Sequence, residues 1–323
     1  MKIVSNFNGD AEWGVVPYMH KTLLTFDDSN SSEVLMNGVE WIYNDEIKKP
    51  YQGYKRKSLL ALWSPCEFTG KEDYYHFEHY AFFDDVFCVC PFTCEFMNQY
   101  FGYEKFYYIP YPFSNYSVKE FGPYDADCSW MGSVSGQDHI SALETLFKFN
   151  YKFITSQKNT WMRHPYEFEK CTHVGLSPHD KLVELSKCKS SLSFNMIYMS
   201  PASRKNKFRA FEHFDQGFMP QLKVRTHEIT SSKSLMIVKK DPWNLIEDFY
   251  DPYKEFVYFE NHKELEDILN DVIKNFDKYQ KVVEKAYTKS KLYKVEEIFK
   301  YIKTKDSSLV SWGNKNTKRK EHV

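Results

Sequence analysis

Short apolar segments, separated by stretches long enough for a helix, recur along the whole sequence and limit the folds open to it. In the first 122 residues these segments lie at 2–7, 41–43, 59–63, 86–90 and 106–110. A second series lies at 128–133, 151–155, 190–195, 234–238 and 255–259. Strands that alternate with helices form parallel sheets that are buried on both faces. The pattern therefore predicts an α/β protein, with helices also expected at 15–24 and 140–147.

A polar stretch at 114–127, which includes the turn dipeptide Gly122-Pro123, separates the two series. We therefore expect one domain at 1–122 and a second at 123–303. Near the end of the second domain, Asn261 and Glu264 have the spacing of a capping box before a helix, and a further helix is expected at 278–303. The basic tail at 304–323 is predicted to be disordered, either solvated or weakly attracted to a membrane surface or polyanion.

The composition excludes several classes of protein. Hydrophobic residues make up 42% of the 323 residues, aromatic residues make up 18%, and the formal net charge is −1. These values exclude a disordered chain and a strongly basic nucleic-acid binder, so nucleic acid is not an expected partner. The mean hydropathy is −0.60, and no apolar run reaches the length of about 18 residues that a membrane span needs.

The cysteines indicate a reducing compartment. Seven of them, an odd number, are scattered between residues 66 and 188, and the N-terminal apolar run is too short for a signal peptide. We therefore expect a cytoplasmic protein, with a peripheral position at a membrane surface as an alternative. Cys88, Cys90 and Cys94 form the one tight group, but they lack the paired spacing of a zinc site. We interpret them as buried thiols and expect no metal site.

Glycine is scarce, and this scarcity excludes the common phosphate-binding loops. The sequence has 12 glycines, of which Gly132 and Gly136 are the closest pair. Neither a dinucleotide-binding fingerprint nor a P-loop can therefore be present, and a phosphate ligand would depend on side-chain cations. The pair Asp125 and Asp127 resembles an Asp-x-Asp metal motif but precedes a predicted strand instead of following one. We therefore set a metal role for this pair aside.

A cation and a carboxylate lie three residues apart in the most informative segment. If a helix begins near Lys223 or Val224, Arg225 and Glu228 share one face of it. Arginine and lysine neutralise phosphate oxygens, and a glutamate accepts hydrogen bonds from vicinal hydroxyls. The pair therefore suits a nucleotide-sugar diphosphate bound at the mouth of a parallel sheet. The alternative from spacing alone is a surface salt bridge between Arg225 and Glu228.

The region 190–301 resembles the donor-binding half of GT-B glycosyltransferases, especially the group 1 and CgeB-like families. The resemblance rests on Arg225-Thr226-His227-Glu228, followed by the strands at 235–238 and 255–259 and the Lys-Glu-Leu at 263–265. Residues 128–133 resemble the strand and loop that open that domain, and residues 106–112 resemble the last strand and linker of an acceptor domain. Residues 192–195 have a weaker similarity to fucosyltransferase and exostosin-type enzymes.

This resemblance implies two Rossmann-like domains facing a cleft, with the last helix packing back on the first domain. The first domain would bind the acceptor, a glycan or another hydroxyl compound, and the second would bind a UDP- or GDP-linked sugar. No cofactor or metal would be required. Glu228 would contact the donor ribose, Arg225 or Lys223 would face the diphosphate, and Asn195 would line the pocket. The residues expected to bind the donor are Gly132, Ser133, Asn195, Lys223, Arg225 and Glu228.

Departures from the family pattern leave the stereochemistry open. Retaining members often carry a second glutamate eight residues before the one that Glu228 matches, but Pro220 occupies that position. The basic pair that often follows the glycine loop is absent, because Gln137, Asp138 and His139 stand there. An acceptor-activating base would come from the strand ends of the first domain. The candidates are Asp10, Glu12 and Glu67.

Two other functions fit the same observations. One is a nucleotide- or carbohydrate-binding protein that has the fold without turnover, which the missing family residues motivate. The other is a glycosyltransferase that modifies DNA bases, against which the near-zero net charge argues. The sequence does not specify the sugar, the nucleotide, the acceptor or the oligomeric state.

Overall fold

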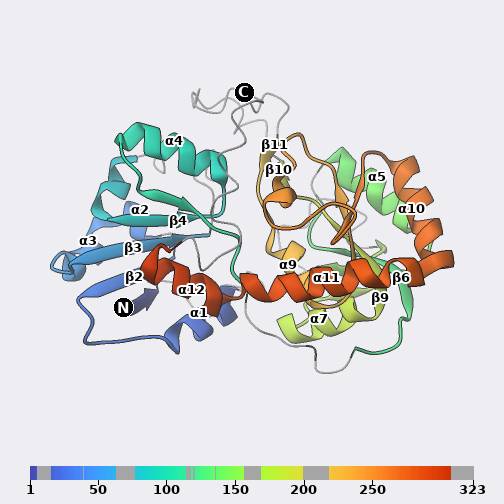
Figure 1. Ribbon diagram of the computed structural model, residues 1–323, viewed down its shortest axis with the longest axis horizontal. Coiled ribbons are helices and arrows are strands. Elements are labelled where there is room, and N and C mark those ends of the chain that lie inside the picture. Colours follow the sequence, from blue (N-terminus) through green and yellow to red (C-terminus); the bar gives the residue numbers. More distant parts are fainter. Residues whose placement is uncertain are drawn as a thin grey trace. The chain divides into compact units, whose positions relative to one another are not determined.

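A computed structural model describes residues 1–5, 16–38, 40–62, 77–113, 118, 121–134, 136–155, 169–198 and 218–306. The chain forms two compact units. The first contains Met1–Ser114, Met196–Leu222 and Lys294–Val323, and the second contains Asn115–Asn195 and Lys223–Tyr293. Each unit is built on its own sheet (Figure 1). Within the described residues no helix is long and apolar enough to cross a membrane.

The first unit has a five-stranded sheet in the order β1-β2-β3-β4-β5, and all of its strand pairs are parallel. The strands are β1 (Lys2–Ser5), β2 (Glu33–Asn37), β3 (Arg56–Ala61), β4 (Asp85–Cys88) and β5 (Phe106–Tyr108). The helices are α1 (Val16–Leu24), α2 (Glu40–Tyr43), α3 (Asp45–Lys48), α4 (Pro91–Phe101) and α12 (Val295–Thr304), with 3-10 turns η1 (Lys49–Tyr51) and η4 (Phe77–Phe82). A two-stranded antiparallel ribbon, β10 (Met196–Tyr198) with β11 (Phe218–Pro220), belongs to the same unit.

The second unit has a six-stranded parallel sheet in the order β13-β12-β9-β6-β7-β8. Its strands are β6 (Ala126–Met131), β7 (Tyr151–Thr155), β8 (His173–Val174), β9 (Cys188–Ser193), β12 (Leu235–Lys239) and β13 (Val257–Phe259). Its helices are α5 (Gln137–Leu146), α7 (Pro178–Ser186), α9 (Val224–Ser231), α10 (His262–Asn275) and α11 (Gln280–Ser290), with 3-10 turns η6 (Leu245–Asp248), η7 (Phe276–Lys278) and η8 (Lys291–Tyr293). These two sheets confirm the predicted parallel α/β class.

The strand order of the second sheet changes direction between β6 and β9. From β6 the chain adds β7 and β8 on one side, and it then returns to add β9, β12 and β13 on the other side. In open parallel sheets, ligands bind at the carboxyl ends of the strands where the order reverses. The residues that directly follow β6 and β9 are therefore placed where a ligand site is expected.

In the first unit one predicted strand is wrong, and the strands β2, β10 and β11 were not predicted. Residues 41–43 were expected to form a strand but lie in helix α2, while the neighbouring strand is β2. The chain leaves β2 at Gly38, whose φ of 126° ends the extended backbone. Trp41 then turns back, and its Nε1 donates a hydrogen bond to the carbonyl oxygen of Asn37 at 3.1 Å. Trp41 is therefore buried by a helical turn. A run of three apolar residues is equally compatible with a buried strand and a buried helical turn, so the sequence does not separate the two.

The helix predicted at 278–303 is divided into α11 and α12. The break lies at η8, where Tyr293 is fully buried and its hydroxyl donates to the carbonyl oxygen of Phe249 at 2.5 Å. Helix α12 belongs to the first unit, where Phe299 stacks on Phe26 with ring centroids 4.9 Å apart. The expectation that the last helix packs on the first domain is confirmed for α12.

A buried carboxylate fastens α12 to the first sheet. Asp85, whose side chain is 4% exposed, accepts from Arg56 Nε at 2.5 Å and from Lys305 Nζ at 2.9 Å. The Arg56 guanidinium also donates to the carbonyl oxygens of Ile302 and Lys303 at the end of α12. Arg56 therefore joins the helix terminus to a strand residue.

Replacing Asp85 with alanine is expected to lower the free energy of unfolding by about 3 kcal/mol, because it leaves two cations without their buried partner. Urea unfolding measures this loss. Glu46→Ala is the control, since Glu46 and its partner Lys49 are exposed and such pairs contribute under about 1 kcal/mol. Equal, small effects of both substitutions would contradict the proposed anchoring role of Asp85.

Candidate functional site

The loop after β6 has a backbone that only glycine adopts without strain. Gly132 has a φ of 106°, and Gly136, which precedes α5, has a φ of 110°. Two hydrogen bonds hold Gly132 in place. Its N–H donates to the carbonyl oxygen of Ile154 at 2.8 Å, and its carbonyl oxygen accepts from Trp130 Nε1 at 2.8 Å. The loop is therefore fixed to the carboxyl end of the sheet.

The side chain of Arg225 occupies the space that Gly132 leaves. Arg225 is the second residue of α9, and its Cζ lies 5.6 Å from the centroid of the Trp130 ring. A Cβ atom on Gly132 would overlap Nη2 of Arg225 and would come within 3.0 Å of Cζ. The absence of a side chain at Gly132 thus lets the guanidinium rest against the loop backbone and the Trp130 ring.

Arg225 keeps its charge at neutral pH and forms no ion pair with a described residue. Burial lowers the pKa of Arg225 to about 10, and the charge of Glu228 partly opposes that shift. At neutral pH the side chain is therefore a cation. Within the described part of the chain, no group accepts a hydrogen bond from the guanidinium. A partly buried guanidinium with unused donors is a favourable ligand for an anion.

His139 lies beside Arg225 and Lys223 but does not add to their positive charge. Its ring packs edge-to-face on Trp130 and Phe194, with centroids 4.8 and 4.6 Å away. Burial lowers the pKa of His139 to about 3, and the nearby charges of Arg225 and Lys223 act in the same direction. His139 is therefore neutral at physiological pH, and Arg225 and Lys223 supply the charge near the start of α5.

Asn195 follows β9 and joins that strand to α9. It is 0% exposed, and its Oδ1 accepts from the hydroxyl of Thr226 at 3.0 Å. The Thr226 hydroxyl also lies 3.2 Å from that of Ser193. The Nδ2 of Asn195 has no hydrogen-bond partner among the residues that the structure describes. A buried amide without an acceptor is costly, so this group is suited to donate to a bound ligand.

Glu228 lies in the same helix as Arg225 but pairs with a different residue. It is 2% exposed, and its Oε1 lies 2.5 Å from Nζ of Lys181, which comes from α7. No ion pair joins Arg225 to Glu228 in the described structure, although the two are three residues apart. The salt bridge that spacing alone suggested is therefore not formed.

The opposite side of α9 is held by a buried polar network. Nδ1 of His227 lies 3.0 Å from the hydroxyl of Tyr250, which also lies 3.0 Å from the hydroxyl of Thr230. Burial lowers the pKa of His227 to about 3, so this ring is neutral at physiological pH. Helix α9 is thus fixed from behind, and its first turn is directed to the loop after β6.

The structure brings some of the predicted site residues together and not others. Gly132 and Arg225 are in contact, and Asn195 is bonded to α9, while Ser133 is exposed in the loop. The proposed bases Asp10, Glu12 and Glu67 lie outside the described residues. The Asp125–Asp127 segment lies at the amino end of β6, where Asp125 pairs with Lys152 at 2.7 Å.

Sequence reasoning missed two residues of the site. Trp130 was expected only as part of a strand. No pattern in the neighbouring sequence predicts that its ring lies against the guanidinium of Arg225. Lys181 is far from Glu228 in the sequence. It stands beside Leu182 and Leu185, the buried residues of its helix, where a surface lysine is ordinary. Only the tertiary fold shows these two partners.

Known proteins are similar to this chain in sequence over one segment and in fold over most of its length. Residues 137–295, which contain α5, α9 and the strands between them, match the family model described as glycosyl transferase-like. This segment is therefore similar to glycosyltransferases in sequence, and the chain as a whole has the GT-B fold. The resemblance to group 1-like GT-B glycosyltransferases is thereby confirmed. No curated protein sequence matches the chain.

Solved structures with the GT-B fold are similar to this chain over most of its length. A mutant of S. aureus TarM, in complex with Fondaparinux, alpha-GlcNAc-glycerol and UDP, is 13% identical with a TM-score of 0.54, over 84% of this chain and 54% of that one. Anabaena HepE, in complex with UDP and glucose, is 11% identical with a TM-score of 0.56, over 90% and 82%. Sucrose-phosphate synthase from Thermosynechococcus elongatus is 11% identical with a TM-score of 0.52, over 91% and 78%. The chain thus spans about half the length of TarM.

Proposed function

We propose that this protein is a glycosyltransferase that moves a sugar from a nucleotide-diphosphate sugar to a hydroxyl group of a glycan or another acceptor. The observation that carries the proposal is the Arg225 guanidinium, which lies at the topological switch point without a protein acceptor among the described residues. A diphosphate is an anion that can use these donors in a bidentate manner. The family match over residues 137–295 supports the same activity.

The proposed mechanism stabilises the departing diphosphate. As the bond between the sugar and the diphosphate breaks, negative charge grows on the leaving phosphate oxygens. Arg225 and Lys223 would attract this charge, and Nδ2 of Asn195 would donate a hydrogen bond to it. Donors that are already in place when charge develops lower the barrier most effectively. Glu228, a buried carboxylate, would accept hydrogen bonds from the hydroxyls of the donor ribose.

The proposal also extends to the nucleotide, the metal requirement, the roles of the two domains and the location of the protein. We expect UDP as the nucleotide in preference to GDP, because the HepE and TarM structures contain UDP. We expect no required metal, because a fixed guanidinium supplies positive charge at the diphosphate. We also propose that residues 1–122 bind the acceptor, with Asp10, Glu12 or Glu67 as its base, that residues 123–303 bind the donor, and that the protein is cytoplasmic.

A thermal-shift panel of UDP-, GDP-, CMP- and dTDP-linked sugars tests the donor. A donor at 100 times its Kd stabilises the folded state by about 2.7 kcal/mol, so the UDP-linked members should raise the Tm. Hydrolysis or transfer is then measured with the member that binds, with and without a chelator. A panel without any shift would rule out the proposed donor class. A shift without turnover would instead favour the binding protein that lacks catalysis.

A further inference from the structure

The buried charge of Glu228 depends on a lysine from another helix. A carboxylate that is 2% exposed needs a counter-charge or hydrogen bonds, because an unpaired buried charge is strongly destabilising. Arg225, three residues earlier, is directed to Gly132 and Trp130. Lys181 supplies the charge instead, with Nζ 2.5 Å from Oε1 of Glu228. The two charged residues of the α9 face are therefore kept apart.

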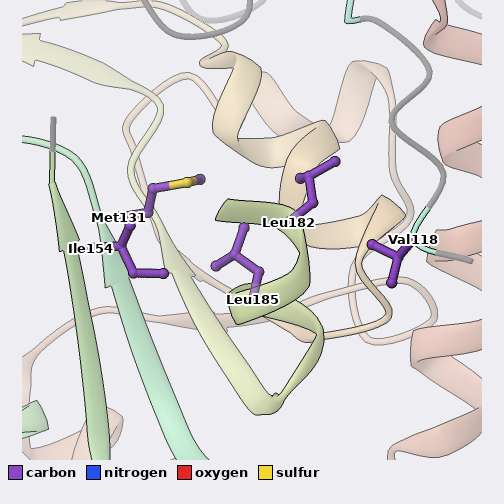
Figure 2. Packing of buried hydrophobic residues seen from close by; sticks show 5 residues of the cluster. All are labelled: Val118, Met131, Ile154, Leu182 and Leu185. Carbon is purple, nitrogen blue, oxygen red and sulfur yellow. The ribbon is translucent and has the colours of Figure 1, made fainter. Parts of the chain in front are cut away.

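Helix α7 holds Lys181 firmly in place. Leu182 and Leu185 of this helix are buried against Met131 of β6 and Ile154 of β7, as Figure 2 shows. The helix also begins with a side-chain cap, since Oγ of Ser177 accepts from the N–H of Asp180 at 3.1 Å. Lys181 thus extends from an element that is packed on the sheet, and its ammonium group has a defined position beside α9.

The two carboxylate oxygens of Glu228 are in different surroundings. Oε1 is enclosed from solvent, where it forms an ion pair with the Lys181 ammonium group but no hydrogen bond with a described residue. Oε2 has no partner among the residues that the structure describes. A carboxylate oxygen accepts hydrogen bonds and does not donate them, so the remaining oxygen suits a hydroxyl and repels a phosphate.

We infer that Lys181 is a positioning residue that fixes the charged Glu228 carboxylate with Oε2 directed to the hydroxyls of the donor ribose. This inference rests on the proposed function, because it specifies how the same site distinguishes the ribose from the diphosphate. Arg225 then binds the diphosphate without competition from Glu228.

Calorimetric titration with UDP and with 2′,3′-dideoxyuridine diphosphate tests the inference. Lys181→Met should weaken UDP binding about tenfold and leave binding of the dideoxy nucleotide unchanged, because only UDP offers ribose hydroxyls. Lys181→Arg should keep most of the wild-type preference for UDP. Lys187→Met is the matched control, since Lys187 ends the same helix and pairs with Glu184 at 2.6 Å instead. It should change neither affinity.

A double variant separates positioning from general damage. Lys181→Met with Glu228→Gln has no unpaired buried charge and should fold, and it should bind UDP no more weakly than Glu228→Gln alone. Additive losses, or an equal loss for both nucleotides, would overturn the inference while leaving the proposed function intact. Wild-type protein that binds neither nucleotide would remove the proposed function, and the role of Lys181 with it.

Discussion

Replacing Arg225 with alanine is expected to weaken UDP binding by about 1–3 kcal/mol, or roughly 5- to 150-fold, because charged hydrogen bonds to the diphosphate are lost. Uridine, which lacks phosphate, should bind the variant and the wild type equally. Isothermal titration with both ligands measures the two affinities. An unchanged UDP affinity would show that the guanidinium does not bind phosphate.

The same substitution should leave the ligand-free protein as stable as before or slightly more stable. Burial lowers the pKa of Arg225 to about 10, which means that its charged form is disfavoured where it lies. No described group compensates with a hydrogen bond. Weaker UDP binding without a loss of folding stability is thus the combination expected of a binding residue. A structural arginine would instead lower the free energy of unfolding when removed, as the urea midpoint would report.

Gly132→Ala is expected to act on both stability and binding. A side chain at a φ of 106° costs about 1–3 kcal/mol of backbone strain, and the new Cβ would displace the Arg225 guanidinium from the loop. UDP binding should therefore fall to about the level of Arg225→Ala. Urea unfolding and titration with UDP measure the two effects separately.

Two other glycines provide controls for Gly132→Ala. Gly102 has a φ of 74°, and a Cβ atom added there would meet nothing within 4 Å, so Gly102→Ala tests backbone strain alone. Gly122 has open space and no such φ, so Gly122→Ala should be nearly neutral. Combining Gly132→Ala with Arg225→Ala should weaken UDP binding no further than Arg225→Ala. If Gly132→Ala matched Gly102→Ala in both measurements, the steric role assigned to Gly132 would be wrong.

Much of the fold could be predicted because apolar strands and amphipathic helices differ in period. Except for the two-residue strand β8, which was not predicted, the strands of the second unit lie close to their expected positions. Asn261 caps α10 by accepting from the N–H groups of Lys263 and Glu264. The errors arose where tertiary packing decides. Residues 41–43 are buried from a helical turn, and Tyr293 ends α11 through a bond to a residue 44 positions away.

The candidate site could be predicted in its parts but not in its pairings. The spacing of Arg225 and Glu228 correctly predicts that both lie in one helix that begins at Val224. It does not predict that they have different neighbours, because Gly132 and Lys181 are remote in the sequence. Local sequence patterns predict which residues share a helix. The strand order of the sheet determines which other residues that helix contacts.

The buried polar network of His227, Thr230 and Tyr250 determines the position of helix α9. This helix has eight residues, which include both the proposed donor-binding residues and the buried residues His227 and Thr230. The hydroxyl of Tyr250 lies 3.0 Å from Nδ1 of His227 and 3.0 Å from the hydroxyl of Thr230. The geometry of the proposed donor site therefore depends on the packed interior of the second unit. A substitution in this interior, far from any ligand, is therefore expected to disturb the proposed donor site through the helix that carries it.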